Sequence, residues 1–233
     1  MTGDGKTLIV TGASRGIGAG LARRACEIGF HVVGLSSTGA SKTPLPYELR
    51  KCDVADMSSV EAALADLKSL PGLYGLINAA GVASMNLHLT TTPETMRRIV
   101  SVNLLGTMYC SALVGRRLAR ARLGRIINFS SIAVPLGLKG ESAYCASKAG
   151  IEAFSRTFSR EMAEFNVTVN VIAPGPIDTD LIGGVSEDQI ERIVKRQVIP
   201  RKATTDDAWD VACYLLSDAA AMVTGETIHL GGV

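Results

Sequence analysis

The sequence predicts an α/β fold: a doubly wound parallel sheet of about seven strands, covered by helices on both faces. Short, continuously apolar segments of strand length alternate along the chain with longer helical segments. Such strands are typical of a parallel sheet that is buried on both faces, and right-handed crossovers then place helices on each side. A glycine-rich turn at residues 12–18 joins the first apolar segment directly to the first helical one.

Each element follows in order from its residue pattern. We expect strands at residues 7–11, 31–35, 48–54, 74–78, 125–130, 167–173 and 227–230. We expect helices at residues 17–28, 57–70, 93–122, 144–165 and 206–216, the third of them broken near Asn103. No repeat, low-complexity tract or linker interrupts this order, which predicts a single domain over residues 1–233.

Composition argues against several classes of function. Apolar residues make up 47% and charged residues 20% of the chain, and the net charge is +2 without a basic block, so we expect neither nucleic acid nor a membrane as a partner. The five cysteines show no C-x-x-C pairing, which predicts reduced thiols and a cytoplasmic location. We find neither the pattern of a signal peptide nor a run of about 18 apolar residues that predicts a membrane span. His31, His88 and His229 are scattered, so we expect no metal site.

The glycine turn carries the first chemical signal. In this position one glycine permits the tight turn, one lets the backbone approach a pyrophosphate, and one allows close packing of helix on strand. The free N–H groups and the positive dipole end of the helix attract phosphate. The turn therefore predicts a dinucleotide-binding site. Its expected contacts are Gly12, Ser14, Arg15, Gly16, Ile17 and Gly18.

The end of the second strand indicates which dinucleotide binds. Enzymes that use NAD usually carry an acidic residue there, which binds the ribose 2′-hydroxyl. This chain has Ser36 and Ser37 instead, and no acid before Glu48. Both hydroxyls can bind a 2′-phosphate, and the Arg15 guanidinium suits it as a charge partner. The pattern predicts NADP(H); the alternative for Arg15 is a solvated loop residue.

Ser131, Tyr144 and Lys148 form the second signal. Tyr144 and Lys148 are four residues apart on a predicted helix and project from one face. A tyrosine titrates near pH ~10, and we expect the neighbouring ammonium to lower the pKa of Tyr144. Tyr144 then gives a proton to a carbonyl oxygen or takes one from an alcohol. Ser131 follows the fifth strand, at the sheet edge where ligands of such folds bind, and its hydroxyl polarises the same oxygen.

Together these motifs resemble the short-chain dehydrogenase/reductase family over nearly the whole chain. The matching segments are TGASRGIG at Thr11–Gly18, Asp53-Val54, NAAG at Asn78–Gly81, Asn103 in SVNLLG, Ser131 in NFSS, YCASK at Tyr144–Lys148, APGPIDT at Ala173–Thr179 and TGETIHLGG at Thr224–Gly232. The resemblance implies a Rossmann-like fold, an NADP(H)-dependent oxidoreductase, and a homotetramer that pairs its two long helices. One departure is Leu230, which stands where many members have an acid or amide before the last two glycines.

The resemblance also implies a role for each matching residue. Asp53 and Val54 contact adenine, and Asn78 stabilises the central sheet. Asn103 holds a water that links Lys148 to solvent as a proton relay. The remaining cofactor contacts that it implies are Ala79, Ala80, Gly81, Tyr144, Lys148, Pro174, Gly175, Ile177 and Thr179.

The motifs resemble the 3-oxoacyl reductase branch more than sugar dehydrogenases. This resemblance implies a 3-oxoacyl thioester of acyl carrier protein or coenzyme A as substrate, and a place in fatty acid biosynthesis. We expect apolar segments at residues 82–89, 132–138 and 176–185 to line its pocket. Arginines around Arg122 favour contact with an acidic carrier protein, whereas Glu164 disfavours it. The alternatives are an NADP(H)-linked dehydrogenase of a sugar or small alcohol or ketone, and a non-catalytic NADP(H)-binding regulator.

Overall fold

Seven parallel strands form one sheet in the order β3-β2-β1-β4-β5-β6-β7. The structure, a computed structural model, describes residues 2–233. The strands are β1 (Thr7–Thr11), β2 (His31–Ser36), β3 (Glu48–Lys51), β4 (Leu73–Asn78), β5 (Gly124–Phe129), β6 (Val167–Ala173) and β7 (Thr227–His229). The chain runs from β1 outward to β3, then crosses back to β4 and continues to β7. The strand order therefore reverses between β1 and β4, the point at which ligands of such sheets bind.

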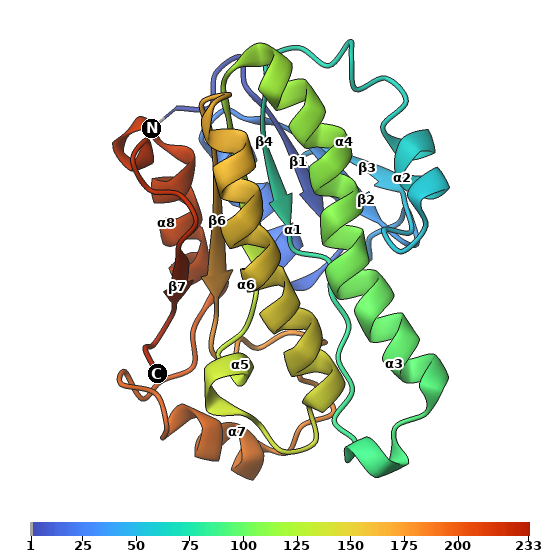
Figure 1. Ribbon diagram of the computed structural model, residues 1–233, viewed down its shortest axis with the longest axis vertical. Coiled ribbons are helices and arrows are strands. Elements are labelled where there is room, and N and C mark those ends of the chain that lie inside the picture. The colour runs from blue at the N-terminus through green and yellow to red at the C-terminus, as the bar shows by residue number, and fades with distance from the viewer. Residues whose placement is uncertain (1) are drawn as a thin grey trace.

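Helices cover both faces of this sheet (Figure 1). On one face α1 (Gly16–Glu27) packs against α8 (Thr205–Leu216). The other face carries α2 (Met57–Ala63), α3 (Pro93–Val100), α4 (Gly106–Ala121) and α6 (Ser142–Ala163). The short helices α5 (Ala133–Leu136) and α7 (Glu187–Val194) lie beyond the carboxyl ends of the strands (Figure 1). This arrangement confirms the predicted fold class.

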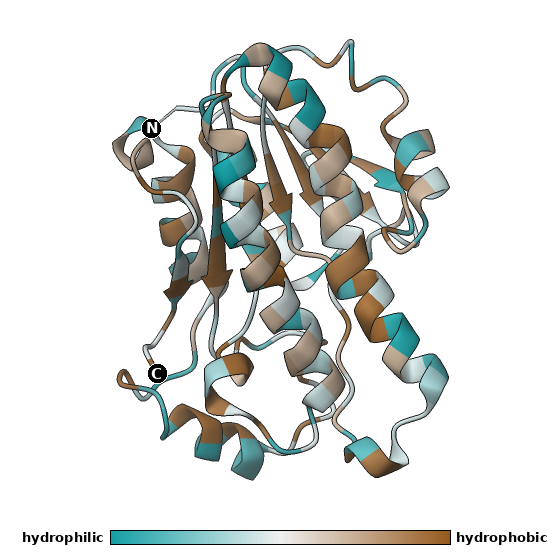
Figure 2. Cartoon of the chain, viewed as in Figure 1, coloured by the Kyte–Doolittle hydropathy of each residue, from teal (hydrophilic) through white to brown (hydrophobic). Residues whose placement is uncertain are grey.

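The pleat of each strand divides its side chains between two hydrophobic cores. In β1, Leu8 and Val10 belong to the core beneath α1 and α8, whereas Ile9 belongs to the core beneath α4 and α6. Trp209 of α8 is buried in the first core, so it is a packing residue. The central strands in Figure 2 are accordingly hydrophobic, whereas the edge strand β3 is hydrophilic and the helices are mixed in character.

Several boundaries differ from the prediction for local reasons. β3 ends at Lys51 rather than at residue 54, because the chain turns so that Val54 packs against Gly106. Helix α2 ends at Ala63, and turns continue from there to residue 70. The unpredicted helix α7 begins with a capping box between Ser186 and Gln189, a pattern that the sequence contains.

The long helical segment predicted at residues 93–122 contains the expected irregularity at Asn103. Residues Ser101–Leu105 form a π-helical turn between α3 and α4. Within the part of the chain that the structure describes, Pro93–Ala121 is the one helix that passes a length and hydropathy test for crossing a membrane, a result that the count of apolar residues did not anticipate. Because α4 packs on β4 and β5, this helix is explained as a core helix of the sheet.

Candidate active site

The glycine turn packs tightly onto the end of β4. Gly12 has a positive φ of 69°, and a Cβ added there would lie 2.9 Å from backbone atoms of Ala79 and Ala80. A Cβ on Gly18 would lie 2.5 Å from the carbonyl oxygen of Gly12. Both positions therefore require glycine, as the prediction assumed.

The start of α1 suits a bound phosphate. Arg15 is the N-cap residue, its side chain makes no cap hydrogen bond, and the first turn of the helix has no acidic residue. The N–H groups of the first turn and the positive end of the helix dipole are therefore left for an anion. Gly16 lies opposite Thr179, whose Cγ2 is 3.6 Å from a Cβ built on that glycine. The turn and the loop after β6 thus lie next to each other at the carboxyl ends of the strands, and we call this region, where the cofactor is expected, the opening.

Ser36 and Ser37 differ in accessibility at the end of β2. Ser36 is buried, and its Oγ accepts a hydrogen bond from the N–H of Gly39 at 3.0 Å. Ser37 is exposed. Arg15, also exposed, forms an ion pair with Asp180 at 3.1 Å. Ser37 and Arg15 are therefore the more accessible of the three predicted phosphate ligands.

The crossover from β2 to β3 has no helix and is tied to the glycine turn. The Tyr47 hydroxyl donates to the carbonyl of Ala13 at 2.7 Å, and the Ser41 hydroxyl donates to the carbonyl of Ser14 at 3.3 Å. After β3, Asp53 is exposed and its carboxylate accepts from the N–H of Ala55. This exposed carboxylate and the tied loop border the end of the sheet at which adenine is expected.

Asn78 joins three elements at the switch point of the sheet. Its Nδ2 donates to Asn128 Oδ1 of β5 at 2.8 Å and to Ser111 Oγ of α4 at 3.1 Å. The next residues form the floor of the opening: the N–H of Ala80 donates to the Thr11 hydroxyl at 3.0 Å. These contacts agree with the structural role expected for Asn78.

Gly81 marks the point where the opening meets two predicted catalytic groups. A Cβ built on Gly81 would lie 3.5 Å from Asn103 Oδ1 and 3.6 Å from Lys148 Nζ. The Asn103 side chain is fully buried and bonded to protein: Oδ1 accepts from the N–H of Val82, and Nδ2 donates to the Val82 carbonyl and to Ser147 Oγ. Asn103 therefore fixes the segment after Gly81 against α6, and its expected water-holding role stays a prediction.

Helix α6 brings Tyr144 and Lys148 together, as their spacing predicts. Both side chains are buried, and Lys148 Nζ lies 5.7 Å from the centre of the Tyr144 ring. The ammonium donates to the carbonyl of Phe129, the last residue of β5, at 2.7 Å. Ser131 follows two residues later, and its Oγ accepts from the N–H of Ala133 at 3.1 Å. The three predicted catalytic groups thus meet where β5 ends.

The pKa values of this cluster correct one expectation. Burial raises the pKa of Tyr144 well above its ordinary value, and the nearby Ser131 hydroxyl opposes that rise. Lys148, expected to lower the pKa of Tyr144, is not among the causes. Instead, burial lowers the pKa of Lys148 itself to about 8. The prediction was wrong because desolvation of the two buried groups outweighs their mutual influence.

The loop after β6 completes the opening. Pro174, Gly175 and Ile177 are buried, and Ile177 pairs with Ala203 in an isolated parallel bridge. A Cβ on Gly175 would overlap Oε1 of Gln197, so a larger residue here would require the Gln197 side chain to move. Gln197 itself donates through Nε2 to the carbonyls of Ile199 and Arg201.

Sequence reasoning missed three buried or half-buried polar residues near this cluster. They are Gln197, Glu141 and Glu152. Glu141, three residues before Tyr144, is buried, and burial raises the pKa of its carboxyl group. Glu152 accepts a hydrogen bond from Ser130. The spacing of four residues from Tyr144 to Lys148 and from Lys148 to Glu152 is the signal that places Glu152 on the same helix face.

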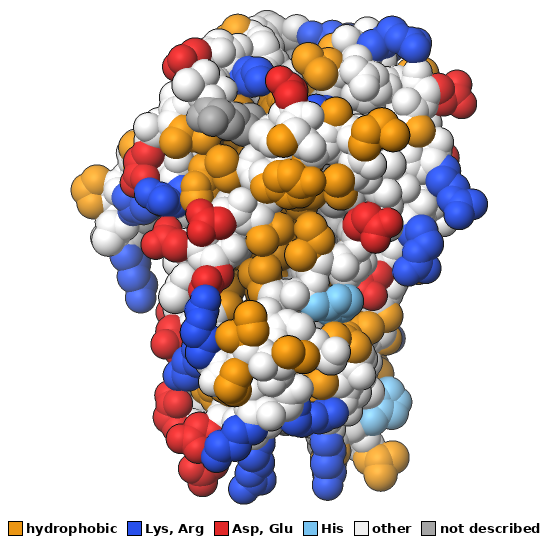
Figure 3. Space-filling view, turned by 90° about the vertical axis from the view of Figure 1, so that its left-hand side faces the viewer, with side chains coloured by type: hydrophobic (Ala, Val, Ile, Leu, Met, Phe, Trp, Pro, Cys, Tyr) orange, Lys and Arg blue, Asp and Glu red, His pale blue; other side chains and the backbone are white. Residues whose placement is uncertain are grey.

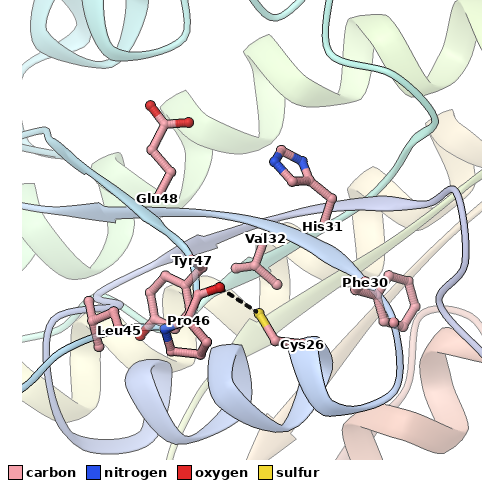
Figure 4. A pocket seen from close by; sticks show the side chains of 9 residues that line it. Cys26, Phe30, His31, Val32, Leu45, Pro46, Tyr47 and Glu48 are labelled. Atoms are coloured by element: carbon pink, nitrogen blue, oxygen red, sulfur yellow. Dashed lines mark hydrogen bonds between the residues drawn. The ribbon is translucent and has the colours of Figure 1, made fainter.

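A separate cavity of about 710 Å³ lies between α1 and the segment before β3 (Figure 4). Its wall includes Phe30, Pro46 and Tyr47, and the Cys26 thiol faces the Pro46 carbonyl at 3.9 Å. His31 and Glu48 point away from Cys26, on the other side of the strands (Figure 4). β2 begins at His31, directly after Phe30. The cavity therefore lies at the amino ends of the strands, whereas Ser131 lies at their carboxyl ends.

Comparisons with known proteins agree with this geometry. A family model described as "Enoyl-(Acyl carrier protein) reductase" matches residues 12–232. The 3-oxoacyl-(acyl-carrier-protein) reductase FabG of Escherichia coli is 34% identical over 239 residues, which cover 100% of this chain and 98% of that protein. Its namesake from Pseudomonas aeruginosa is 35% identical over 242 residues, with the same coverage of both chains.

Solved structures include both reductases and sugar dehydrogenases. Aldohexose dehydrogenase from Thermoplasma acidophilum superposes with a TM-score of 0.88 at 28% identity, covering 98% of this chain and 94% of that one. The 3-oxoacyl-(acyl-carrier protein) reductase from Brucella melitensis has a TM-score of 0.88 at 26% identity and covers 100% and 92%. With the family match over nearly its whole length, this chain belongs to the short-chain dehydrogenase/reductase family and is an oxidoreductase that acts on CH–OH groups with a nicotinamide cofactor.

Proposed function

We propose that this protein reduces the keto group of a 3-oxoacyl thioester to a secondary alcohol, with NADPH as the hydride source. The observation that carries the proposal is the convergence of Ser131, Tyr144 and Lys148 where β5 ends. Reductases of 3-oxoacyl carrier-protein esters among the relatives support the substrate class. A non-catalytic regulator would not need Ser131, Tyr144 and Lys148 together.

The protonation states of the cluster suit reduction. Because burial raises the pKa of Tyr144, the phenol is protonated at neutral pH and ready to donate. When bound, the nicotinamide supplies the hydride. Ser131 and Tyr144 donate hydrogen bonds to the substrate carbonyl oxygen, and Tyr144 then transfers its proton to that oxygen. Lys148, with a pKa of about 8, remains mostly protonated at neutral pH. It returns a proton to Tyr144 and regains its own from solvent through water held near Asn103.

NADPH rather than NADH is proposed from the adenosine end of the opening. The accessible groups there are Ser37 and Arg15, and no acidic residue follows β2 before Glu48. The Glu48 carboxylate is bound by Arg50 at 2.8 Å. A 2′-phosphate would therefore meet a guanidinium and a hydroxyl rather than a free carboxylate.

The pocket segments support an acyl substrate, but the arginines do not support carrier-protein docking within one subunit. Leu87, Leu89 and Leu181 are exposed on the segments expected to line the pocket. Arg117 lies in the last turns of α4, and Arg122 directly follows that helix. Both are therefore close to the start of β5, at the end of the sheet opposite to Ser131. The carrier protein is therefore proposed from the relatives alone.

A sugar dehydrogenase is the second candidate, and one observation favours it. The buried Glu141 carboxyl lies near enough to Tyr144 to raise the pKa of the phenol, and it would accept hydrogen bonds from substrate hydroxyls. An aldohexose dehydrogenase is also among the similar structures.

The deciding assay follows NADPH consumption with acetoacetyl-coenzyme A and an acetoacetyl carrier protein, beside cyclic ketones and keto-sugars. We expect the highest kcat/KM with a thioester. A keto-sugar or cyclic ketone that is turned over with far higher kcat/KM than either thioester would reject the substrate, and leave the roles of Ser131, Tyr144 and Lys148 standing.

We also propose a cytoplasmic homotetramer. The edge strand β7 is only half-buried, and an edge strand presents unpaired N–H and C=O groups that another chain can bind. Figure 3 shows hydrophobic side chains gathered on the face that carries α8 and β7. The proposed helix pairing has less surface available, because Ile151 and Met162 of α6 are buried in their own subunit and only the stacked Phe154 and Phe158 remain half-buried.

A further inference from the structure

Three consecutive residues at the end of β5 are each hydrogen-bonded to α6. Asn128 Nδ2 donates to Ser155 Oγ at 2.8 Å, and Lys148 Nζ donates to the carbonyl of Phe129 at 2.7 Å. The Ser130 hydroxyl donates to Glu152 Oε1 at 2.5 Å. Ser130 is buried, and Glu152 is half-buried. A polar ladder therefore connects the strand to the helix up to the residue before Ser131.

The bond from Ser130 to Glu152 is the shortest contact of this ladder. A hydroxyl has one proton, and the alternative acceptor, the Lys148 carbonyl, lies 3.4 Å away. A carboxylate acceptor makes shorter and stronger hydrogen bonds than a neutral one. The bond thus ties Ser130 to α6, in addition to the backbone bonds from the N–H of Ser130 to the Ile172 carbonyl and from the N–H of Ile132 to the Pro174 carbonyl.

The ladder determines how Ser131 faces Tyr144. Ser131 follows Ser130 directly, and Tyr144 lies two turns before Glu152 on the same helix. If Ser130 shifts along the helix, the Ser131 hydroxyl shifts with it relative to the phenol. The family resemblance implies that Lys148 also contacts the cofactor. If its ammonium leaves the Phe129 carbonyl to do so, that bond no longer helps to hold the end of β5 against α6 during turnover.

We propose that Glu152 is a positioning residue: it holds Ser130 so that the Ser131 hydroxyl and the Tyr144 phenol address the same substrate oxygen. This inference rests on the proposed roles of Ser131 and Tyr144, and it holds for any carbonyl substrate that the enzyme reduces. Glu152 itself touches neither substrate nor cofactor in this account.

The test compares Glu152→Ala, Glu152→Gln and Ser130→Ala with the matched control Glu161→Ala, an exposed glutamate on the same helix. Misplacement of a reacting group by about 1 Å costs up to ~10²-fold in rate. We therefore expect Glu152→Ala and Ser130→Ala to lower kcat by roughly ten- to a hundredfold, with KM for NADPH unchanged. Glu152→Gln keeps an acceptor for Ser130 and should restore kcat to within about threefold of wild type. The double variant, which combines Glu152→Ala with Ser130→Ala, should lose no more kcat than either single variant.

Four results would overturn the proposal. They are a Glu152→Ala kcat within twofold of wild type, an equal loss in Glu161→Ala, a Gln variant no better than Ala, and additive losses in the double variant. A crystal structure of Glu152→Ala tests the displacement of Ser131 from Tyr144 without any assay. If thioesters are not reduced, the proposed substrate fails, and the same variants are compared on whichever carbonyl compound is turned over. If Tyr144→Phe keeps its activity, the proposed chemistry fails while the structural displacement is still measurable.

Discussion

Arg15, at the start of α1, and Asp180, in the loop after β6, form an ion pair at 3.1 Å that connects the glycine turn to this loop. Their side chains are 73% and 64% exposed. Exposed pairs of this kind contribute about 0–1 kcal/mol, so a 2′-phosphate can take Arg15 from Asp180 at little cost. A 2′-phosphate bound as proposed for NADPH would therefore compete with Asp180 for one guanidinium.

This competition predicts the cofactor affinities of two variants. Arg15→Ala should weaken NADPH binding about tenfold or more, because a charge-assisted contact is worth roughly 1.5–3 kcal/mol, and should leave NADH binding nearly unchanged. Asp180→Asn should tighten NADPH binding by up to about fivefold. Fluorescence titration of both cofactors measures this, with Arg97→Ala as the control, since Arg97 has an equally exposed ion pair with Glu94. Equal wild-type affinities for NADPH and NADH would reject the NADPH proposal.

Tyr144→Phe removes the proposed proton donor and little else. The phenyl ring remains to fill the buried site, so we expect the fold and cofactor affinity to be kept while kcat falls by about 10²–10⁴-fold. Steady-state kinetics and NADPH titration on the same preparation separate the two effects. Near wild-type turnover in this variant would show that the proton comes from another group.

Lys148→Met should abolish turnover and yet stabilise the folded protein at neutral pH. Burial lowers the pKa of Lys148 from 10.5 to about 8, so below pH 8 the folded state carries an unfavourable buried charge. This costs on the order of 3 kcal/mol, offset in part by roughly 1 kcal/mol for the hydrogen bond to the Phe129 carbonyl.

The pH dependence of that difference is its check. As pH rises from 8 to 10.5, the folded wild type loses its proton before the unfolded chain does, and the stability of the wild type rises. The advantage of Lys148→Met in thermal midpoint should therefore shrink over this window. Lys139→Met, at an exposed lysine, should show no such change. A constant difference across the window would mean that Lys148 is not desolvated.

The homotetramer predicts a mass four times that of the chain by light scattering at micromolar concentration. Tyr214→Asp places a charge on the exposed part of α8 and should give a smaller assembly, whereas Leu89→Asp, far more exposed and distant from α8 in the fold, should not. A monomer mass for the wild type would reject the tetramer.

Local patterns determined the fold class and the identity of the site. The continuous apolar strands, the glycine turn after β1 and the four-residue spacing of Tyr144 and Lys148 each depend on neighbours in the sequence, and each was found where it was predicted. The break at Asn103 was also visible, because a polar residue interrupts an apolar helix. Short elements such as α5 lack enough residues to show a periodic pattern, so the sequence analysis missed them.

Only the tertiary structure decided the pKa values of the site residues and the contacts between residues far apart in the chain. The raised pKa of Tyr144 and the lowered pKa of Lys148 come from desolvation by segments far away in the chain, which no local spacing reveals. The same holds for the bond between Ser130 and Glu152, which joins residues 22 positions apart, and for the ion pair between Arg15 and Asp180, which joins residues 165 apart. The sequence alone thus indicated which groups are proposed to carry the chemistry. Packing of strand against helix decided the distances between them, because those distances depend on contacts that exist only in the folded chain.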